Sequence, residues 1–360
     1  MKRALIILVA ILLLSTPVTN AAKAKKKGDA PAEEETSLMS SKTFAALKLR
    51  SIGPAINSGR ITEFAVNPSK RQHFFAAVAS GGVWKTTNAG TTWEPVFDSE
   101  GSYSIGCVAM DPANPDVVWV GTGENNSQRS VSFGDGVYKS TDGGQTWANV
   151  GLGESEHVGM ITIDPRDTDV VYVAAQGPLW RSGGDRGVYK TTDGGETWER
   201  ILHVSDDTGI NEVHMDTRDP DVLYASAYQR RRHVWTLLNG GPESAIYRSL
   251  DAGATWEKLE KGLPEVEMGR IGLAVSPVDP DVIYAIVEAQ RDEGGVFRST
   301  DRGSSWEKRS DYMSQSPQYY NELVADPRDV GTVYSMDTWL HVSVDGGKTF
   351  TKVGEKHKHV

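Results

Sequence analysis

The octet Ser140–Trp147, "STDGGQTW", occurs in six variants along this chain of 360 residues. Each copy reads Ser or Thr, any residue, Asp or Asn, any residue, Gly, any residue, Ser or Thr, and a final Trp or Phe. The copies end 54, 51, 58, 50 and 44 residues apart, at Trp93, Trp147, Trp198, Trp256, Trp306 and Phe350. A repeat of this length is typical of proteins built from one supersecondary unit used several times.

The residue types within the octet predict a turn. Gly adopts the positive φ that tight turns need, while the Asp carboxylate and the Ser or Thr hydroxyl bond the turn's own backbone N–H groups. The final aromatic side chain is expected to fill space between neighbouring repeats. Six acids distributed around a repeat protein cannot meet at one bond, so we interpret this position as structural. It is occupied by Asn88, Asp142, Asp193, Asp251, Asp301 and Asp345.

Each repeat also predicts four short strands. In the second repeat these are "IGCVAMD" (105–111), "VVWVGT" (117–122), "GVYKST" (136–141) and "TWANVG" (146–151), separated by segments rich in Gly, Pro, Asp and Asn. No segment after the N-terminus has helical periodicity. We therefore predict an all-β fold, a β-propeller of six four-stranded antiparallel blades over residues 44–360.

The N-terminus predicts an export signal. Residues 1–21 combine a basic start, an apolar run from Ala4 to Leu14 and small residues up to Ala21, the layout of a secretory signal peptide. Residues 22–43 read as a disordered charged linker. We expect a secreted or periplasmic protein with no membrane span in the mature chain. The net charge of −10 argues against nucleic acid as a partner. Cys107, the only cysteine, is expected to be buried and inert.

Ring closure raises a separate expectation. Residues Leu47 to Ile52 resemble the fourth strand of a blade, yet the sixth repeat already has its own fourth strand, "TFTKVG" (349–354). We predict an incomplete ring, with seven or more blades in a full-length protein.

Strand parity divides the loops between two faces. In an antiparallel four-stranded blade, the first and third turns lie at one end, and the second turn and the link to the next blade lie at the other. The octets therefore share one face, called here the octet face. The opposite face, called the variable face, receives the long irregular loops such as 123–135 and 228–244. Loops of this kind carry binding and catalytic residues.

Candidate ligand-binding residues lie on the variable face. One group is expected at the mouth of the central channel: Arg60, His157, Arg270 and Tyr319. A second group comes from the long loops: Asn125, Arg129, Trp180, Arg181, Arg231, Trp235, Tyr320 and Trp339. Arginine suits carboxylates and phosphates, and exposed aromatic side chains suit carbohydrate or peptide. The alternatives are pairing of the arginines with acids such as Glu63 or Glu156, satellite cores around Trp180 and Trp235, and a solvated surface for the run 230–232.

Catalytic residues are less well defined. Hydrolysis of a glycoside needs two carboxylates about 5 to 10 Å apart. Glu124 with Asp135 or Asp185 is a candidate pair, although no spacing compels it. The scattered histidines lack metal-ligand spacing, so we predict no metal site and no cofactor.

The octets are similar to the Asp-box, or BNR, repeat of sialidases, xyloglucanase-type glycoside hydrolases and the sortilin N-terminal propeller. Over residues 47–359 the chain resembles secreted bacterial proteins of the sortilin N-terminal-like group, often labelled glycosyl hydrolases by analogy. The resemblance implies a propeller that binds protein, peptide or glycan without catalysis. The first alternative is a glycoside hydrolase, xyloglucanase-like or sialidase-like, or part of one. The second is an assembly-factor scaffold, because a similar propeller occurs in a photosystem-assembly protein.

One stretch departs from the xyloglucanase pattern. Those enzymes carry an Asp just before a Gly-Gly pair in the first blade of each propeller. In "AVASGGVWK" (77–85) this chain has Ala79 and Ser80 there, which counts against their mechanism. The sialidase pattern also needs an N-terminal arginine motif that is absent.

Overall fold

The computed structural model describes residues 59–127 and 131–354. The predicted signal peptide, the linker, the unpaired strand at 47–52 and Arg129 lie outside the described residues. These predictions therefore stay as they were stated. In the described part, no helix is long and apolar enough to cross a membrane.

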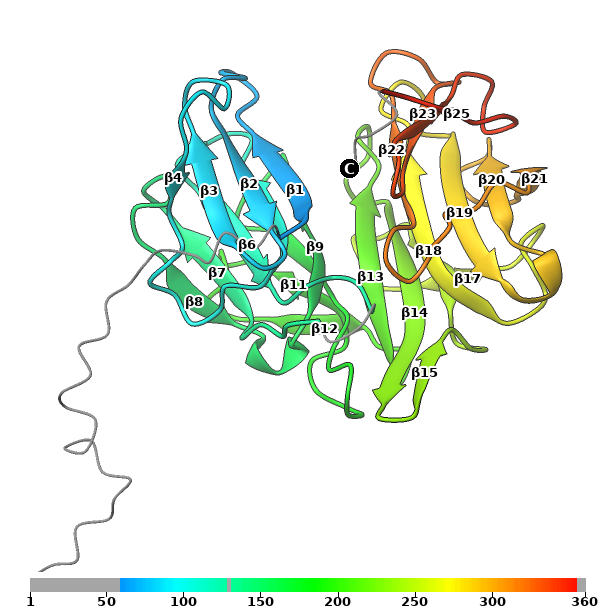
Figure 1. The fold of residues 1–360 in the computed structure, drawn as a ribbon, viewed down its shortest axis with the longest axis horizontal. Helices are drawn as coiled ribbons and strands as arrows, with labels where there is room; N and C mark the ends of the chain where they lie inside the picture. The colour runs from blue at the N-terminus through cyan, green and yellow to red at the C-terminus, as the bar shows by residue number, and fades with distance from the viewer. Residues whose placement is uncertain (1–58, 128–130, 355–360) are drawn as a thin grey trace, which may run out of the picture. The chain divides into compact units, whose positions relative to one another are not determined.

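The prediction of an all-β propeller with six four-stranded antiparallel blades is confirmed (Figure 1). Blade 1 contains β1 (Ile61–Val66), β2 (Phe74–Val78), β3 (Gly82–Thr86) and β4 (Glu94–Pro95). Blade 2 contains β5 (Ile105–Met110), β6 (Val118–Thr122), β7 (Val137–Ser140) and β8 (Ala148–Gly151). Blade 3 contains β9 (Val158–Ile163), β10 (Val171–Ala175), β11 (Gly187–Thr191) and β12 (Glu199–Leu202).

Blade 4 contains β13 (Thr208–Met215), β14 (Leu223–His233), β16 (Ala245–Ser249) and β17 (Glu257–Leu259), with β15 (Thr236–Asn239) paired to β14. Blade 5 contains β18 (Met268–Val275), β19 (Ile283–Ala289), β20 (Gly295–Ser299) and β21 (Glu307–Ser310). Blade 6 contains β22 (Glu322–Ala325), β23 (Val333–Met336), β24 (His341–Ser343) and β25 (Thr351–Lys352). The helical segments in the described part are two short 3-10 turns, η1 (Gly153–Ser155) and η2 (Gln290–Asp292).

Every octet is a turn, as its composition predicts. In the second copy, the Asp142 carboxylate accepts the backbone N–H of Thr146 at 2.9 Å and its hydroxyl at 2.6 Å. The Ser140 hydroxyl oxygen accepts the N–H of Gly144 at 2.8 Å. The same two backbone bonds recur in the other five copies. Hydrogen bonds from Thr146 and Ser140 lower the pKa of Asp142 to about 2. Since both of its oxygens accept hydrogen bonds within the turn, this carboxylate is structural.

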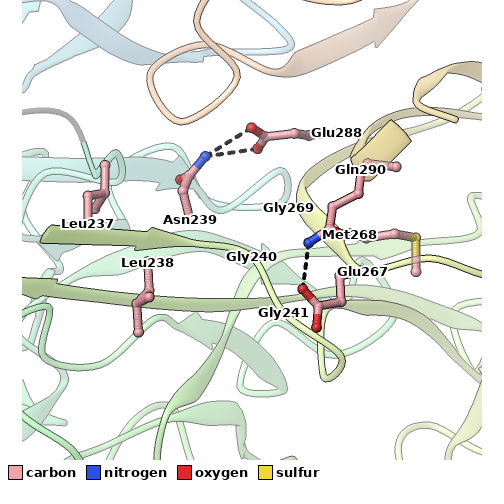
Figure 2. A pocket seen from close by; sticks show the side chains of 11 residues that line it. Leu237, Leu238, Asn239, Gly240, Gly241, Glu267, Met268, Gly269, Glu288 and Gln290 are labelled. Atoms are coloured by element: carbon pink, nitrogen blue, oxygen red, sulfur yellow. Dashed lines mark hydrogen bonds between the residues drawn. The ribbon is translucent and has the colours of Figure 1, made fainter. Parts of the chain in front are cut away.

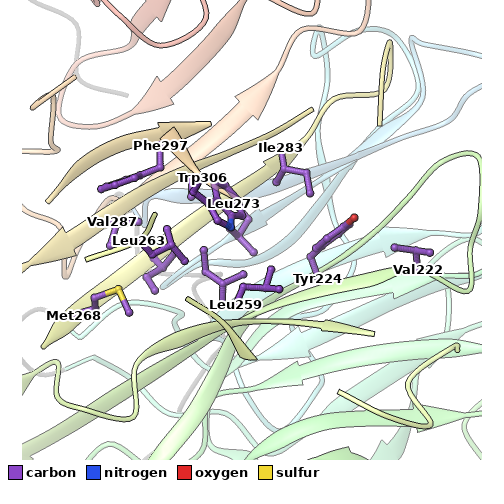
Figure 3. Close-up of a cluster of buried hydrophobic side chains, with 13 residues drawn as sticks. Val222, Tyr224, Leu259, Leu263, Met268, Leu273, Ile283, Val287, Phe297 and Trp306 are labelled. Atoms are coloured by element: carbon purple, nitrogen blue, oxygen red, sulfur yellow. The ribbon is translucent and has the colours of Figure 1, made fainter. Parts of the chain in front are cut away.

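The aromatic residue that ends an octet packs against the preceding blade. The Trp147 indole N–H donates to the Val96 carbonyl at 2.7 Å, and Trp198 donates to Val150 at 2.8 Å. In blade 5, Trp306 lies in a buried cluster with Leu259 and Leu263 of the preceding blade (Figure 3). The core of the propeller is therefore a series of apolar layers between successive blades. Cys107 is buried in one of these layers, and burial raises the pKa of its thiol.

The blade pairing confirms the two predicted faces, with one correction. The predicted loop 228–244 is largely a β-hairpin, because β14 continues to His233 and pairs with β15 from Arg230↔Asn239 to His233↔Thr236. This hairpin extends blade 4 beyond the other blades on the variable face, and it forms one wall of the candidate site.

An inner-strand carboxyl makes stability depend on pH. Glu63 of β1 accepts the backbone N–H of Val108 at 3.0 Å, and burial raises its pKa to about 8. In the unfolded chain the same carboxyl ionises near pH 4.3. The native state therefore binds an extra proton between these values, and the free energy of unfolding should fall as pH rises from about 4.5 to about 8. Glu63→Gln should flatten this slope in urea titrations at several pH values. An unchanged slope would assign the pH dependence to other groups.

Candidate functional site

A pocket of about 320 Å³ lies on the variable face, between the β14–β15 hairpin and the adjoining ends of β18 and β19 (Figure 2). Its lining residues are Leu237, Leu238, Asn239, Gly240, Gly241, Glu267, Met268, Gly269, Glu288, Ala289 and Gln290. The lining combines apolar side chains, two carboxylates and two carboxamides, and the described residues that form it include no Lys, Arg or His. A concave site of this kind, with a few convergent polar groups, is the usual form of a small-ligand site.

Glu288 is the more buried of the two carboxylates. The Asn239 amide nitrogen donates to both of its oxygens, at 3.0 and 3.1 Å, and the backbone N–H of Arg270 donates to Oε2 at 3.0 Å. Burial raises the pKa of Glu288, while these donors and the charge of Arg270 oppose the rise. Oε2 accepts N–H groups from two residues and Oε1 from one, so Oε1 is the less engaged of the two oxygens.

Glu267, the second carboxylate, directly precedes β18, the strand that pairs with β19. Met268 pairs with Ala289, and the Gln290 N–H donates to the Glu267 carbonyl, so Glu267 stands opposite Gln290. Glu267 and Glu288 thus lie near each other at one end of the β18–β19 ladder, and both line the pocket. The Gln290 amide donates to Glu267 Oε2 at 2.6 Å (Figure 2). Gly269 is required between them, since a Cβ there would lie 2.2 Å from Glu288 Oε2.

Asn239 is itself held by two buried hydroxyls. Its Oδ1 accepts the hydroxyl of Tyr228 on β14 and, at 3.3 Å, the hydroxyl of Ser127. The two hydroxyls also contact each other at 3.1 Å. Both side chains are almost fully buried. The orientation of the Asn239 amide is therefore set by two buried hydroxyls that do not line the pocket.

Ser127 belongs to a loop that joins several blades, Glu124–Ser127. Glu124 forms an ion pair with Arg60 of blade 1, and its carbonyl contacts His157 Nδ1 of blade 3 at 2.8 Å. The Ser127 N–H donates to the Gln318 carbonyl of blade 6 at 3.0 Å. The loop expected to be a ligand-binding loop thus connects the blades at the centre of the variable face.

The residues predicted at the channel mouth are mostly engaged in protein contacts. Arg60 lies over the Tyr319 ring, 4.2 Å from its centroid, and donates to its hydroxyl. Arg270 is 1% exposed and pairs with Glu322 at 2.8 Å, and His157 is also 1% exposed. The acid-pairing alternative describes both arginines, although the partners are Glu124 and Glu322.

The predicted loop residues that the structure describes are half-buried or exposed, and most of them contact other residues of the fold. Asn125 offers its carbonyl to Gln176 at 3.1 Å, Arg231 pairs with Asp207, and Arg181 pairs with Glu154 and Glu156. Tyr320 packs on Tyr319, and Lys352 lies over the Trp339 ring.

Two tryptophans remain prominent on the variable face. Trp180 is 48% exposed, and Trp235 is 82% exposed at the tip of the β14–β15 hairpin. Trp235 stacks on His233 but stays largely exposed, so a satellite core is the wrong interpretation for it. The run 230–232 is not a solvated surface either, because Arg230 is fully buried.

The three predicted catalytic acids do not line the pocket. Glu124 pairs with Arg60, Asp135 accepts the Tyr138 hydroxyl at 2.7 Å, and Asp185 accepts the backbone N–H of Glu154 at 3.0 Å. Ala79, where the xyloglucanase pattern has an acid, is fully buried. In the described part of the chain, no three His, Cys, Asp or Glu side chains gather as a metal site would require.

Sequence reasoning missed Glu267, Glu288 and Asn239. The sequence carried a usable signal for the two acids. Glu267 lies just before β18 and Glu288 lies near the end of β19, so both are expected at the end of the β18–β19 pair that is opposite the connecting turn. Asn239 had no such signal, since its place depends on the unforeseen hairpin.

Comparisons with known proteins support one of the predicted alternatives. No family model matches the chain. A xyloglucanase of Paenibacillus sp. is 24% identical over 339 residues, which cover 82% of this chain and 31% of that enzyme. Xyloglucanase Xgh74A of Acetivibrio thermocellus is 24% identical over 376 residues, which cover 89% of this chain and 44% of that enzyme. The chain thus spans less than half the length of these curated relatives.

Solved structures show the same fold. The GH74 xyloglucanase of Xanthomonas campestris superposes with a TM-score of 0.61 at 18% identity, over 79% of this chain and 45% of that one. YCF48 bound to D1 peptide superposes with a TM-score of 0.51 at 15% identity, over 82% of each chain. The sequence relatives favour the glycoside hydrolase alternative over the non-catalytic binder placed first on sequence grounds. The sortilin-like grouping stays a prediction.

Proposed function

We propose that this chain is a glycoside hydrolase, or part of one, that acts on a xyloglucan-like glycan at the pocket formed by Asn239, Glu267 and Glu288. The observation that carries the proposal is a pair of carboxylates, Glu267 and Glu288, that line one pocket on the variable face. The xyloglucanase relatives, which align with most of the chain, supply the substrate class.

The two carboxylates differ in the way that glycoside hydrolysis requires. Glu288 has a raised pKa and therefore holds a proton to higher pH than an ordinary glutamate. It is assigned as the general acid that protonates the departing glycosidic oxygen through Oε1. Glu267 is exposed and supplies the second carboxylate, which activates water or stabilises the positive charge that develops on the sugar.

The neighbouring hairpin offers a platform for the sugar ring. Trp235 projects from the tip of the same β14–β15 hairpin whose β15 lines the pocket. An exposed indole stacks well on the apolar face of a pyranose, and burying it on binding releases water from both surfaces. The proposal includes export of the protein, which is supported by the signal peptide predicted for residues 1–21.

The direct test is release of reducing ends from xyloglucan by the purified chain, with a neutral β-glucan and a sialoside for comparison. Release from xyloglucan supports the proposal. A folded sample that binds xyloglucan without releasing ends would support the binding function instead.

Trp235→Ala should weaken binding of xyloglucan by about 10-fold, because loss of one stacking contact costs on the order of 1 to 2 kcal/mol. Affinity electrophoresis in gels that contain xyloglucan measures this change. The matched control is Trp93→Ala, which removes a tryptophan that is 41% exposed on the octet face. Equal retardation of the two variants and the parent chain would contradict a role for the hairpin.

A further inference from the structure

We infer that Tyr228 and Ser127 are positioning residues, whose hydroxyls orient the Asn239 amide so that its N–H groups face Glu288 and set the proton affinity of that carboxyl. Neither residue lines the pocket. The inference rests on the proposed function for its catalytic consequence, while the proton affinity of Glu288 can be measured without any substrate.

The geometry supports this chain of contacts. An Asn amide has one acceptor oxygen and two N–H donors. Here the oxygen receives the hydroxyls of Tyr228 and Ser127, and the nitrogen lies 3.0 and 3.1 Å from the two oxygens of Glu288 (Figure 2). If the amide turned over, its oxygen would face the carboxylate of Glu288 and its N–H groups would face the two hydroxyls.

Burial makes the two hydroxyls reliable donors. Tyr228 is 1% exposed and Ser127 is fully buried, so water does not compete for their bonds. Burial also raises the pKa of Tyr228 to about 12, which keeps its hydroxyl protonated through the neutral range. Ser127 lies in the loop that joins several blades, so the orientation of Asn239 depends on the assembled propeller.

Charged groups near Glu288 also affect its pKa. Arg270 of β18 provides the backbone N–H and a favourable charge. On β14, Tyr228 donates its hydroxyl to Asn239, and Arg230 stands opposite Asn239 in the hairpin. Glu267, at the start of β18, lines the same pocket. The side chain of Arg270 pairs with Glu322, so it does not take the place of the Asn239 amide as a hydrogen-bond donor to Glu288.

The test is the titration of Glu288 followed by NMR of protein labelled with ¹³C-glutamate, with the signal assigned by its loss in Glu288→Gln. Asn239→Leu removes both N–H donors at similar volume. The pKa of Glu288 should rise by about one unit, because a hydrogen bond to a charged group is worth roughly 1.5 kcal/mol. Tyr228→Phe and Ser127→Ala should each raise it by a smaller amount.

The matched control is Tyr224→Phe, which removes a buried hydroxyl from the same strand, where it donates to the Arg302 carbonyl at the octet face. This variant should leave the titration unchanged. A titration that stays at the parent value in both Tyr228→Phe and Ser127→Ala would overturn the inference, whatever the result for Asn239→Leu. A shift without any xyloglucan hydrolysis would support it while contradicting the proposed function.

Discussion

Replacing Glu288 with Gln should reduce kcat on xyloglucan by about 1,000-fold, within the range of 10² to 10⁴ attributed to a general acid. Gln keeps the size of the side chain and can still accept the N–H groups of Asn239 and Arg270, but it carries no transferable proton. KM should change little, since the substitution removes an interaction that matters in the transition state. Initial rates at several xyloglucan concentrations measure both constants.

The matched control for this prediction is Glu265→Gln. Glu265 is exposed, precedes Glu267 by two residues and does not line the pocket. Its substitution should leave kcat within about 2-fold of the parent value, because an exposed charge outside the site contributes little. Hydrolysis at the parent rate by Glu288→Gln would exclude this carboxyl as the acid and would return the search to Glu124, Asp135 and Asp185.

Trp306→Ala should lower the free energy of unfolding by about 3 to 5 kcal/mol, as expected for removal of a buried tryptophan. Trp306 is 6% exposed and lies between blades 4 and 5 with Leu259, Leu263 and Met268 (Figure 3). Its loss leaves a cavity between two β-sheets, whose backbone hydrogen bonds prevent the walls from closing. Urea denaturation followed by circular dichroism measures the change.

Trp93→Ala supplies the comparison at the corresponding position of the first octet. Trp93 is 41% exposed and packs edge-on against Phe74. Its substitution should cost about 1 kcal/mol, because Trp93 buries much less of its surface than Trp306 does. Equal losses for Trp93→Ala and Trp306→Ala would show that the octet, rather than packing between blades, determines the contribution of its tryptophan.

The octets illustrate what could be predicted from sequence. Asp142 and Ser140 bond backbone groups only two to four residues away, so the turn depends on local residue types alone. Strand bounds followed from the same local information, because Gly, Pro, Asp and Asn separate short alternating segments. The faces of the propeller then followed from counting strands.

The candidate site could not be found in this way. Glu288 is one of many acids in the chain, and its role depends on Asn239, which reaches it only through the β14–β15 hairpin. The predicted acids Glu124 and Asp135 looked equally suitable in sequence, yet each is engaged by a partner within the fold. Burial, which raises the pKa of Glu288, is also a property of the assembled structure.

The sequence by itself determined the repeat, the turns, the strand order and the two faces, because these depend on contacts within a few residues or on the alternation of neighbouring side chains. Only the tertiary structure decided which acid is buried, which arginine is paired, and which tryptophan is covered by a neighbouring blade. These outcomes depend on contacts between residues far apart in the chain, such as Ser127 with Asn239 and Arg60 with Tyr319, and no local pattern encodes them.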